Sequence, residues 1–239
     1  MNTSETGQPK GHLHPISQVI NEINRIFSEM GFEVAEGPEI ETEFYNFDAL
    51  GTAKNHPSRD MQDTFWLKAA GANGEKLLPR THTSGVQVRF SETHKPPFRI
   101  IAPGKVFRNE ATDATHEADF YQVEGMVVAE KVSMADLKGT LQRFAREFFG
   151  ADTEIRFRPS YFPFVEPGIE VDVKFKGKWL EVLGAGLTHP NVLKAGGLDP
   201  EVWQGFAFGM GLDRLVMLKY GITDIRNLYS GDLRFVNQF

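Results

Sequence analysis

Apolar residues recur with the period of an α-helix in three parts of the chain. A stripe at every third or fourth position runs from Ile16 to Met30 and is followed by a glycine, a natural helix terminator. Ser133, with an aspartate three positions later, resembles a capping box and opens a second stripe that ends at Gly150. The pattern predicts a helix in each segment, and a third helix that Gly221 closes.

Alternating or continuous apolar runs predict β-strands between these helices. The clearest alternation places Ile169, Val171 and Val173 on one face and charged residues on the other. Residues 63–80 predict a hairpin, whereas residues 44–62 show no clean period and are expected to form a long loop. Further strands are predicted in "FEVAEGPEI", broken at Gly37 and Pro38, in residues 98–108 and 119–129, and in "TEIRFRP" and "KWLEVLG".

The order of these elements indicates an α+β fold. The strands cluster without a regular βαβ alternation, and several neighbours are joined by connections of hairpin length. This favours a largely antiparallel sheet with helices packed on it. With 239 residues the chain is long enough to bury a substantial core. We expect one domain over residues 12–239, behind a flexible polar lead over residues 1–11.

Composition narrows the kinds of site that the chain can form. It contains no cysteine, which excludes disulfides and thiolate metal sites. The formal net charge of -6 provides no sequence-wide basic field for nucleic acid. The N-terminal stretch lacks the apolar run of a signal peptide, and no segment is long and apolar enough to span a bilayer. We therefore expect a cytoplasmic protein without a membrane partner.

Polar and charged side chains are dense in the segment "FRNEATDATHEADFYQVEG". Arg108 and Glu110 alternate on the first of the two predicted strands that it joins. Phe120, Gln122 and Glu124 alternate on the second, so each set shares a face. An arginine and a glutamate alone are typical of a salt bridge on an exposed sheet. Together with an aromatic ring and further hydrogen-bonding groups, they suit the phosphates, base plane and base edge of a nucleotide.

Two further segments carry candidate chemistry. In "GFAFGMGLDR", Gly209 and Gly211 permit close backbone approach, and Arg214 follows in the first turn of a helix, where free amides favour anions. In "YFPFVEPG", Phe162 and Phe164 share a face around a proline and precede a glutamate. Taken separately, such glycines more often serve strand-to-helix packing, and such phenylalanines more often belong to a core.

The three segments together resemble the signatures of class II aminoacyl-tRNA synthetases. "FRNE…HEADF" is similar to the second signature, "GFAFGMGLDR" to the third, and "GFEVAEGPEIE" to the first, with Pro38 at its dimer-forming strand. The sequence over residues 12–239 resembles that of the α subunit of bacterial-type phenylalanyl-tRNA synthetases. The segments that carry this resemblance are "RTHTSGVQVR", "RFRPSYFPFVEP", "KWLEVLGAGLTHPNVL" and "DLRFVNQF". The fold implied by this resemblance is an antiparallel sheet flanked by helices, which agrees with the pattern.

This resemblance implies activation of L-phenylalanine by ATP to phenylalanyl-adenylate, with release of pyrophosphate, and transfer of phenylalanine to tRNA(Phe). The implied catalytic residues are Arg108, on the α-phosphate, and Arg214, at the far end of the bent nucleotide. Phe120 would cover the adenine, Glu110 would accept a hydrogen bond from its amino group, and His116 would meet the outer phosphates. Glu166 is implied as a Mg²⁺ ligand, since a hard cation prefers carboxylate and phosphate oxygens.

The same resemblance implies an amino-acid site beside the nucleotide. A small floor in this site would select substrates by size, because a tyrosine hydroxyl buried there without a partner would cost about 1–3 kcal/mol. The matching residues are His82, Ser84, Gln122 and Glu124 around the ammonium and carboxylate, Phe162 and Phe164 edge-to-face with the substrate ring, and Ala207 and Gly209 at the floor.

The resemblance also implies partners. The family enzyme is an α₂β₂ tetramer whose β subunit supplies much of the tRNA surface, and a homodimer through the Pro38 strand is the alternative. Family α subunits carry an N-terminal helical arm that contacts tRNA, where this sequence has a short polar lead. We therefore expect amino-acid activation to be better supported than tRNA charging. A second hypothesis is a non-catalytic, synthetase-like binding or scaffold protein, which would need no phosphate clamp at both ends of the nucleotide.

Overall fold

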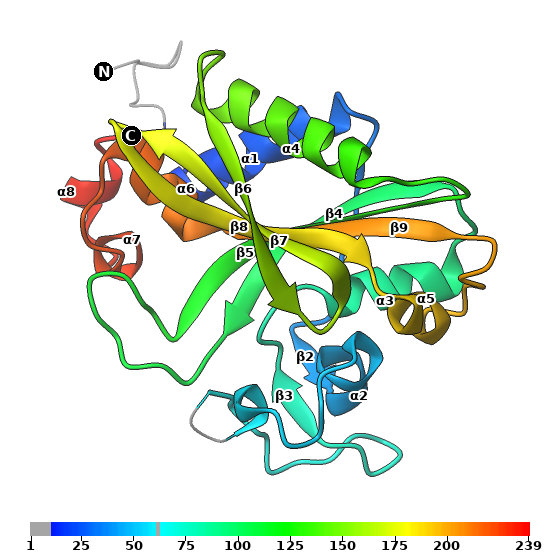
Figure 1. The fold of residues 1–239 in the computed structure, drawn as a ribbon. Helices are drawn as coiled ribbons and strands as arrows, with labels where there is room; N and C mark the ends of the chain where they lie inside the picture. Colours follow the sequence, from blue (N-terminus) through cyan, green and yellow to red (C-terminus); the bar gives the residue numbers. More distant parts are fainter. Residues whose placement is uncertain (1–10, 61–62) are drawn as a thin grey trace.

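The computed structural model describes residues 11–60 and 63–239, so the expected polar lead lies outside the described residues except for Gly11. At the centre of the molecule is a seven-stranded sheet in the order β1-β4-β5-β9-β8-β7-β6 (Figure 1). Neighbouring strands are antiparallel except for β1 and β4, which are parallel. The bounds are β1 (Glu33–Val34), β4 (Phe98–Phe107), β5 (Asp119–Ala129), β6 (Ile155–Phe162), β7 (Val165–Phe175), β8 (Lys178–Thr188) and β9 (Gln204–Gly211).

Helices cover the two faces of this sheet to different extents (Figure 1). On one face pack α1 (Pro15–Ser28), α4 (Met134–Phe149) and α6 (Leu212–Tyr220), while α3 (Gly85–Thr93) and α5 (Pro190–Ala195) lie over part of the other. This arrangement confirms the predicted α+β fold. No helix within the described ranges is long and apolar enough to cross a membrane. The shorter elements are α2 (Glu43–Asn46), η1 (Asp48–Leu50), η2 (Pro57–Arg59), α7 (Arg226–Tyr229), α8 (Leu233–Val236), β2 (Ile40–Thr42) and β3 (Leu77–Pro79).

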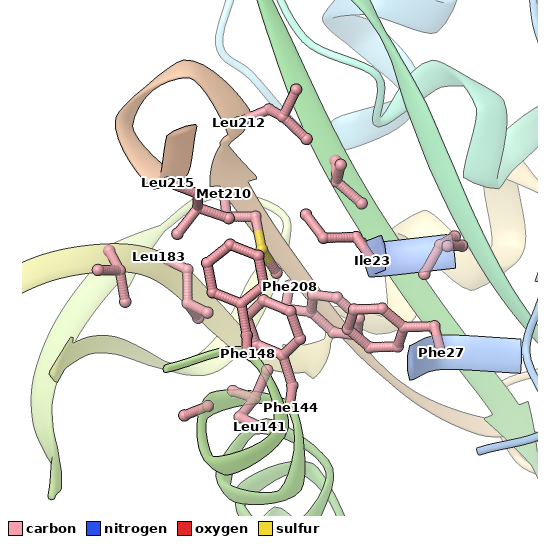
Figure 2. Packing of buried hydrophobic residues seen from close by; sticks show 14 of the residues in the cluster. Ile23, Phe27, Leu141, Phe144, Phe148, Leu183, Phe208, Met210, Leu212 and Leu215 are labelled. Atoms are coloured by element: carbon pink, nitrogen blue, oxygen red, sulfur yellow. The ribbon is translucent and has the colours of Figure 1, made fainter. Parts of the chain in front are cut away.

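The face under α1, α4 and α6 holds the main hydrophobic core. Phe27 stacks on Phe144 and on Phe208, with ring centroids 5.2 Å apart in both pairs (Figure 2). All three rings are buried, as the helical stripes predict for the two on helices. The capping box that Ser133 forms with Asp136 at the start of α4 is present. Several of the phenylalanines therefore serve the core, as the sequence suggests.

The opposite face is only partly covered, and this decides where a site can form. α3 and α5 pack on β4 and β5 through a small apolar cluster that includes Val86 and Met126. Beyond this cluster, strand register places Glu124, Gly209 and Gly184 in one row across β5, β9 and β8. Because side chains two positions apart share a face, this row lies on the same side as Met126. The row borders a cavity.

One prediction of local structure is wrong, and a second holds only in part. The segment predicted as a loop over residues 44–62 contains the short helices α2, η1 and η2 within its described part. Side chains of Thr42 and His56 accept hydrogen bonds from the first turns of α2 and η2, and such local caps leave no long-range period in a sequence. The hairpin predicted over residues 63–80 forms in part: Ala70 and Lys76 form an antiparallel bridge, and the backbone N–H of Leu67 donates to the carbonyl oxygen of Leu77 at 2.9 Å. Only its second arm contains a strand, β3, which pairs with β2.

Two strand ends also differ from the prediction. β4 ends at Phe107, where its pairing with Asp119 of β5 ends, so Arg108 and Glu110 follow the strand and do not alternate on it. Pro38 lies in the link between β1 and β2 and is not part of a strand. Proline has no N–H to donate to a ladder, which is consistent with a break at this position.

Candidate active site

A cavity of about 290 Å³ opens on the partly covered face of the sheet. Strands β5, β8 and β9 contribute to it, together with the β6–β7 turn and the segment that begins α3. Every residue predicted to bind the amino acid lies in its lining, and so does Arg108. The lining consists of His82, Ser84, Gln87, Arg108, Gln122, Glu124, Phe162, Phe164, Gly184, Ala185, Ala207, Phe208 and Gly209.

The carboxylate of Glu124 is held by three donors at the start of α3. Its Oε1 accepts a hydrogen bond from the backbone N–H of Thr83 at 3.1 Å. Its Oε2 accepts a hydrogen bond from the hydroxyl of Ser84. The same oxygen accepts a second hydrogen bond from the side-chain amide of Gln87 at 3.3 Å. Glu124 is only 7% exposed. The start of α3 and β5 are thus joined through one buried carboxylate.

Burial disfavours the ionised form of the Glu124 carboxylate. It raises the pKa of Glu124 to about 7, although the bonds from Ser84 and Thr83 and the positive charge of Arg108 favour the ionised form. A cation placed directly against a buried carboxylate favours its ionised form. Glu124 is therefore suited to receive a ligand's ammonium group.

Two buried polar atoms of the cavity have no hydrogen-bond partner among the described residues: Nδ1 of His82 and Oε1 of Gln122. Burial, followed by the positive charge of Arg108, lowers the pKa of His82 to about 4, so its ring is neutral near pH 7. Buried polar groups in folded proteins are nearly always paired. These atoms therefore mark positions where a polar ligand would bind.

Two aromatic rings, an aromatic wall, line the same cavity as these polar groups. The rings of Phe162 and Phe164 lie 5.8 Å apart between centroids, with an interplanar angle of 23°. A Cβ on Gly184 would come within 2.8 Å of the Phe162 ring. Glycine at position 184 thus lets this ring lie close against β8. Both rings are half-buried and can contact an apolar ligand group.

Two small residues of β9, Ala207 and Gly209, line the cavity; they are the residues expected at the floor of the amino-acid site. Ala207 is 7% exposed. A Cβ on Gly209 would approach Cγ of Glu124 to 3.0 Å, so glycine there allows the close approach that the sequence predicts. At Gly211, by contrast, a Cβ would meet nothing within 4 Å, so no contact of the described chain requires glycine at that position.

Arg108 provides a permanent positive charge at the edge of the cavity. Its Nε donates to the carbonyl oxygen of Thr81 at 3.2 Å, and its guanidinium carbon lies 5.0 Å from the centroid of the Phe120 ring. Burial lowers the pKa of Arg108, while the charges of Glu110 and Glu124 act in the opposite direction. An arginine stays protonated under these conditions. The cavity therefore combines a carboxylate and a guanidinium.

A second cavity, of about 420 Å³, adjoins the first. His82, Arg108, Phe162 and Phe164 line both. Glu110 lies in the second cavity beside Arg108, whereas Phe120 lines neither. The structure thus does not bring together, in one cavity, the two residues predicted to bind the adenine. Arg108 lies on the wall between two adjacent spaces.

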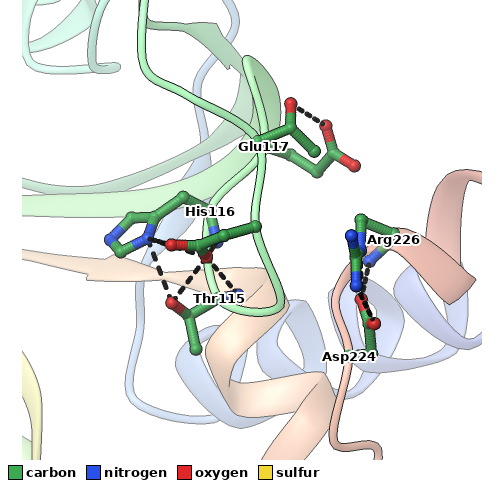
Figure 3. Close-up of polar contacts among 7 residues, drawn as sticks. Thr115, His116, Glu117, Asp224 and Arg226 are labelled. Carbon is green, nitrogen blue, oxygen red and sulfur yellow. Dashed lines mark hydrogen bonds and ion pairs between the residues drawn. The ribbon is translucent and has the colours of Figure 1, made fainter.

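The loop between β4 and β5 holds His116 on a compact turn (Figure 3). The carboxylate of Asp113 accepts hydrogen bonds from the backbone N–H groups of Thr115, at 2.6 Å, and His116, at 2.9 Å. Its Oδ1 also lies 3.0 Å from Nδ1 of the His116 ring. These interactions, first among them the backbone bond from Thr115, hold the pKa of Asp113 well below its usual range. The exposed His116 is thus fixed on its loop by an ionised neighbour.

Arg214 occupies the first turn of α6, as predicted, but it lies outside both cavities. It is exposed and borders a third hollow of about 370 Å³, together with Thr115 of the β4–β5 loop. The two predicted catalytic arginines therefore belong to different hollows. A ligand that contacts both must extend from the edge of the first cavity to the β4–β5 loop.

Glu166, the predicted metal ligand, has a side chain that is 79% exposed. Its Oε2 lies 3.7 Å from Nε2 of His189, the residue that caps α5. Among the residues with described positions, no three His, Asp or Glu side chains are grouped so that they could hold a metal ion. A Mg²⁺ ion at Glu166 would therefore take most of its ligands from water and a bound substrate.

Gln87 belongs to the site but is absent from the sequence prediction. It is 4% exposed and reaches Glu124 from α3. Gln87 follows Ser84 by three positions, a spacing that places both side chains on the same side of a helix. The apolar pattern in this segment is too short to define the helix, so the spacing alone could have revealed the residue.

Comparison with known proteins identifies the fold and the family. The family model for the class II core domain of tRNA synthetases (F) matches residues 1–239. The chain belongs to the class II aminoacyl-tRNA synthetases. The resemblance of the sequence to this class is thereby confirmed.

Relatives narrow the family further. The chain is 55% identical over 241 residues to the phenylalanine--tRNA ligase alpha subunit of Alkaliphilus oremlandii, with 96% of this chain and 69% of the relative covered. It is 56% identical over 230 residues to the phenylalanine--tRNA ligase alpha subunit of Shewanella sediminis, covering 96% of this chain and 68% of that one. This class II chain therefore belongs to the phenylalanine--tRNA ligase alpha subunit family.

A solved structure supports the same class II fold. The pyrrolysyl-tRNA synthetase from Desulfitobacterium hafniense superimposes with a TM-score of 0.69 at 18% sequence identity, covering 91% of this chain and 74% of that one. At this identity the likeness concerns the fold alone. The sheet and its flanking helices are therefore features of class II synthetases that differ widely in sequence.

Proposed function

We propose that the chain activates L-phenylalanine with ATP and transfers it to tRNA(Phe). In the first step an oxygen of the amino-acid carboxylate attacks the α-phosphorus, and the bond from that phosphorus to the bridging oxygen of pyrophosphate breaks. The observation that supports this proposal best is the first cavity, in which Glu124, Arg108 and an aromatic wall surround a space of about 290 Å³. No covalent enzyme intermediate is required, since orientation and charge stabilisation can supply the rate.

The cavity matches each part of a phenylalanine molecule. The ammonium group would bind Glu124 and the unpaired Oε1 of Gln122, and neutral His82 would complete the polar contacts around it. The substrate ring would lie against Phe162 and Phe164, with the edge-to-face geometry that the family resemblance implies. The substrate carboxylate would then point toward Arg108, at the border of the second cavity.

The nucleotide would lie along β5 and the loop that precedes it. Arg108 would bind the α-phosphate, because it borders the amino-acid cavity and its charge can stabilise the transition state. Phe120 and Arg214 would hold the adenine, His116 would meet the outer phosphates, and Glu110 would contact the base edge. A bent nucleotide suits the separation of Arg108 and Arg214 into different hollows.

Mg²⁺ would be held by Glu166 together with phosphate oxygens of ATP, an arrangement that this ion commonly adopts. Since Glu166 is one exposed carboxylate, the ion would bind with the nucleotide and not ahead of it. When bound, it would neutralise charge on the phosphates. The orientation of the amino acid depends on the chain's own residues.

Partners follow from the family. The relatives are named as alpha subunits, and we propose that this chain works with a β subunit, with a homodimer through the Pro38 region as the alternative. Its net charge of -6 offers little attraction for tRNA. A partner chain would therefore supply much of the tRNA-binding surface, and the assembly would work in the cytoplasm.

The proposal is tested by phenylalanine-dependent exchange of pyrophosphate into ATP, measured on the purified chain with and without a β subunit. We expect exchange that depends on both phenylalanine and Mg²⁺. Charging of tRNA(Phe) is expected to need the β subunit. Absence of exchange in both conditions would rule out the catalytic function. Phenylalanine binding without exchange would instead support the scaffold hypothesis, which the paired presence of Arg108 and Arg214 argues against.

Replacement of Ala207 by glycine is expected to widen the amino-acid cavity. Without the methyl group at the floor, para-chlorophenylalanine should gain about tenfold in kcat/KM relative to phenylalanine, the effect of space for one small group. Exchange assays with both amino acids measure this ratio. Ala145→Gly, which removes a buried methyl group from α4 on the opposite face, is the control. An unchanged ratio in the Ala207 variant would show that the floor lies elsewhere.

A further inference from the structure

Asp213 is a buried carboxylate next to Arg214, and neither the cavities nor the proposed chemistry uses it. It is 2% exposed. Its Oδ2 accepts a hydrogen bond from the backbone N–H of Tyr121 at 2.6 Å, and its Oδ1 accepts one from the hydroxyl of Tyr229. One side chain thus joins α6, β5 and α7, three elements that are separate along the chain.

The contact with Tyr121 compensates for a missing strand partner. Pairing between β5 and β9 extends to Gln122 and Gly211, and the chain then turns from β9 into α6. Tyr121 is the next residue of β5 and would otherwise leave its N–H without a partner on that side. A buried N–H without an acceptor is costly. The Asp213 carboxylate therefore takes the place of the strand that has ended.

The two backbones joined in this way carry the residues proposed to hold the adenine. Tyr121 follows Phe120 directly, and Asp213 precedes Arg214 directly. We propose that Asp213 is a positioning residue for the nucleotide: by joining the Phe120 strand to the Arg214 helix, it sets the distance between the two side chains that hold the base. This inference rests on the proposed nucleotide site and adds a residue that touches no substrate.

Residues of the C-terminal segment contact both Asp213 and the β4–β5 loop. Tyr229 supplies the hydroxyl to Asp213. Four residues earlier, the backbone N–H of Ile225 donates to the carbonyl oxygen of Ala114 in the β4–β5 loop at 2.9 Å. Asp224 and Arg226, on either side of Ile225, pair with each other beside that loop (Figure 3). Residues 225–229 therefore fix both the loop that carries His116 and the carboxylate next to Arg214.

The electrostatics are consistent with a structural hydrogen-bond acceptor. Burial raises the pKa of Asp213 to about 6, against the bonds from Tyr229 and Tyr121 that favour the ionised form, and Asp119 adds a like charge. Asp213 carries no ion pair among the described contacts. Its role is thus to accept two hydrogen bonds.

The test compares Asp213→Ala with Asp213→Asn. Alanine removes both acceptors, whereas the asparagine amide can still accept from Tyr121 and donate to the Tyr229 oxygen. We expect the Kd for ATP to rise about tenfold in the alanine variant and to stay within about twofold of the unaltered chain in the asparagine variant. The Kd for phenylalanine should change in neither. Both are measured by isothermal titration calorimetry on the full chain.

Tyr229→Phe keeps the proposal testable where the alanine variant does not fold. It removes one of the two bonds, and an increase of about threefold in the Kd for ATP is expected. Tyr220→Phe is the matched control, because its hydroxyl contacts Gln18 and lies outside this network. Calorimetry requires no turnover, so failure of the exchange assay would contradict the proposed function without deciding this inference. Equal losses of ATP and phenylalanine affinity, or an unchanged Kd for ATP in Tyr229→Phe, would overturn it.

Discussion

Replacement of Arg108 by alanine is expected to lower phenylalanine-dependent ATP–pyrophosphate exchange by about a thousandfold. Arg108 is the one permanent cation among the residues that line the first cavity, and His82 beside it is neutral near pH 7. The negative charge that develops on the α-phosphate would therefore lose its nearest counter-charge. The effect should appear in kcat at saturating concentrations of both substrates.

Two variants separate the stabilisation of the α-phosphate by Arg108 from the effect of losing any arginine or any positive charge. Arg99→Ala removes an exposed arginine from β4, the strand that precedes Arg108, and should leave exchange unchanged. Arg108→Lys keeps the charge but loses the planar fork that contacts phosphate oxygens, so it should recover part of the rate. Because the charge of Arg108 also favours ionisation of Glu124, the variants should be compared near pH 8. Exchange within tenfold of the unaltered chain in Arg108→Ala would contradict the assignment.

Glu124→Gln is expected to raise the KM for phenylalanine about a hundredfold, with a smaller change in kcat. The size matches the loss of one partner from a buried charge pair. The glutamine keeps the shape of the side chain and can still accept from Thr83, but it carries no charge for the ammonium group. Glu130→Gln, an exposed change just beyond the end of β5, serves as the control. A KM unchanged in Glu124→Gln would mean that the ammonium group binds elsewhere.

The same carboxylate predicts how phenylalanine binding depends on pH. Since burial raises the pKa of Glu124 to about 7 and the ammonium group binds the ionised form, affinity should fall about tenfold per unit as the pH drops below 7. This dependence should vanish in Glu124→Gln. Stability of the ligand-free chain has the opposite sign: the raised pKa stabilises the fold below about pH 4.5, and this contribution is lost as the pH rises through about 7.

Much of the fold could be predicted because its long elements bury one side. The stripe that begins at Ile16 and the stripe that follows Ser133 became α1 and α4, since a helix buried along one face must repeat apolar residues at its own period. Short elements have no such constraint. The two residues of β1 pair in parallel with β4 across more than sixty intervening positions, and no local pattern encodes that choice.

The residues predicted around the amino acid line one cavity, whereas those predicted around the nucleotide do not, and this difference has a physical reason. Gln122 and Glu124 lie on a regular strand, where alternation fixes the face of each side chain. Arg108 and Glu110 lie beyond the end of β4, where backbone direction depends on the loop that follows. The bonds of Asp213 to Tyr121 and Tyr229 depend on the end of one strand and the start of a helix. Only the folded chain brings these groups together.

Strand β9 alone separates the main hydrophobic core from the first cavity. Phe208 stacks on Phe27 on one side, while its neighbours Ala207 and Gly209 border the cavity on the other. The depth of the cavity is therefore tied to how the two aromatic rings pack behind it. Gly125 adds to this constraint, because a Cβ there would come within 2.2 Å of the Phe208 ring. Substitutions at core positions behind β9 would therefore change the shape of the cavity without lining it.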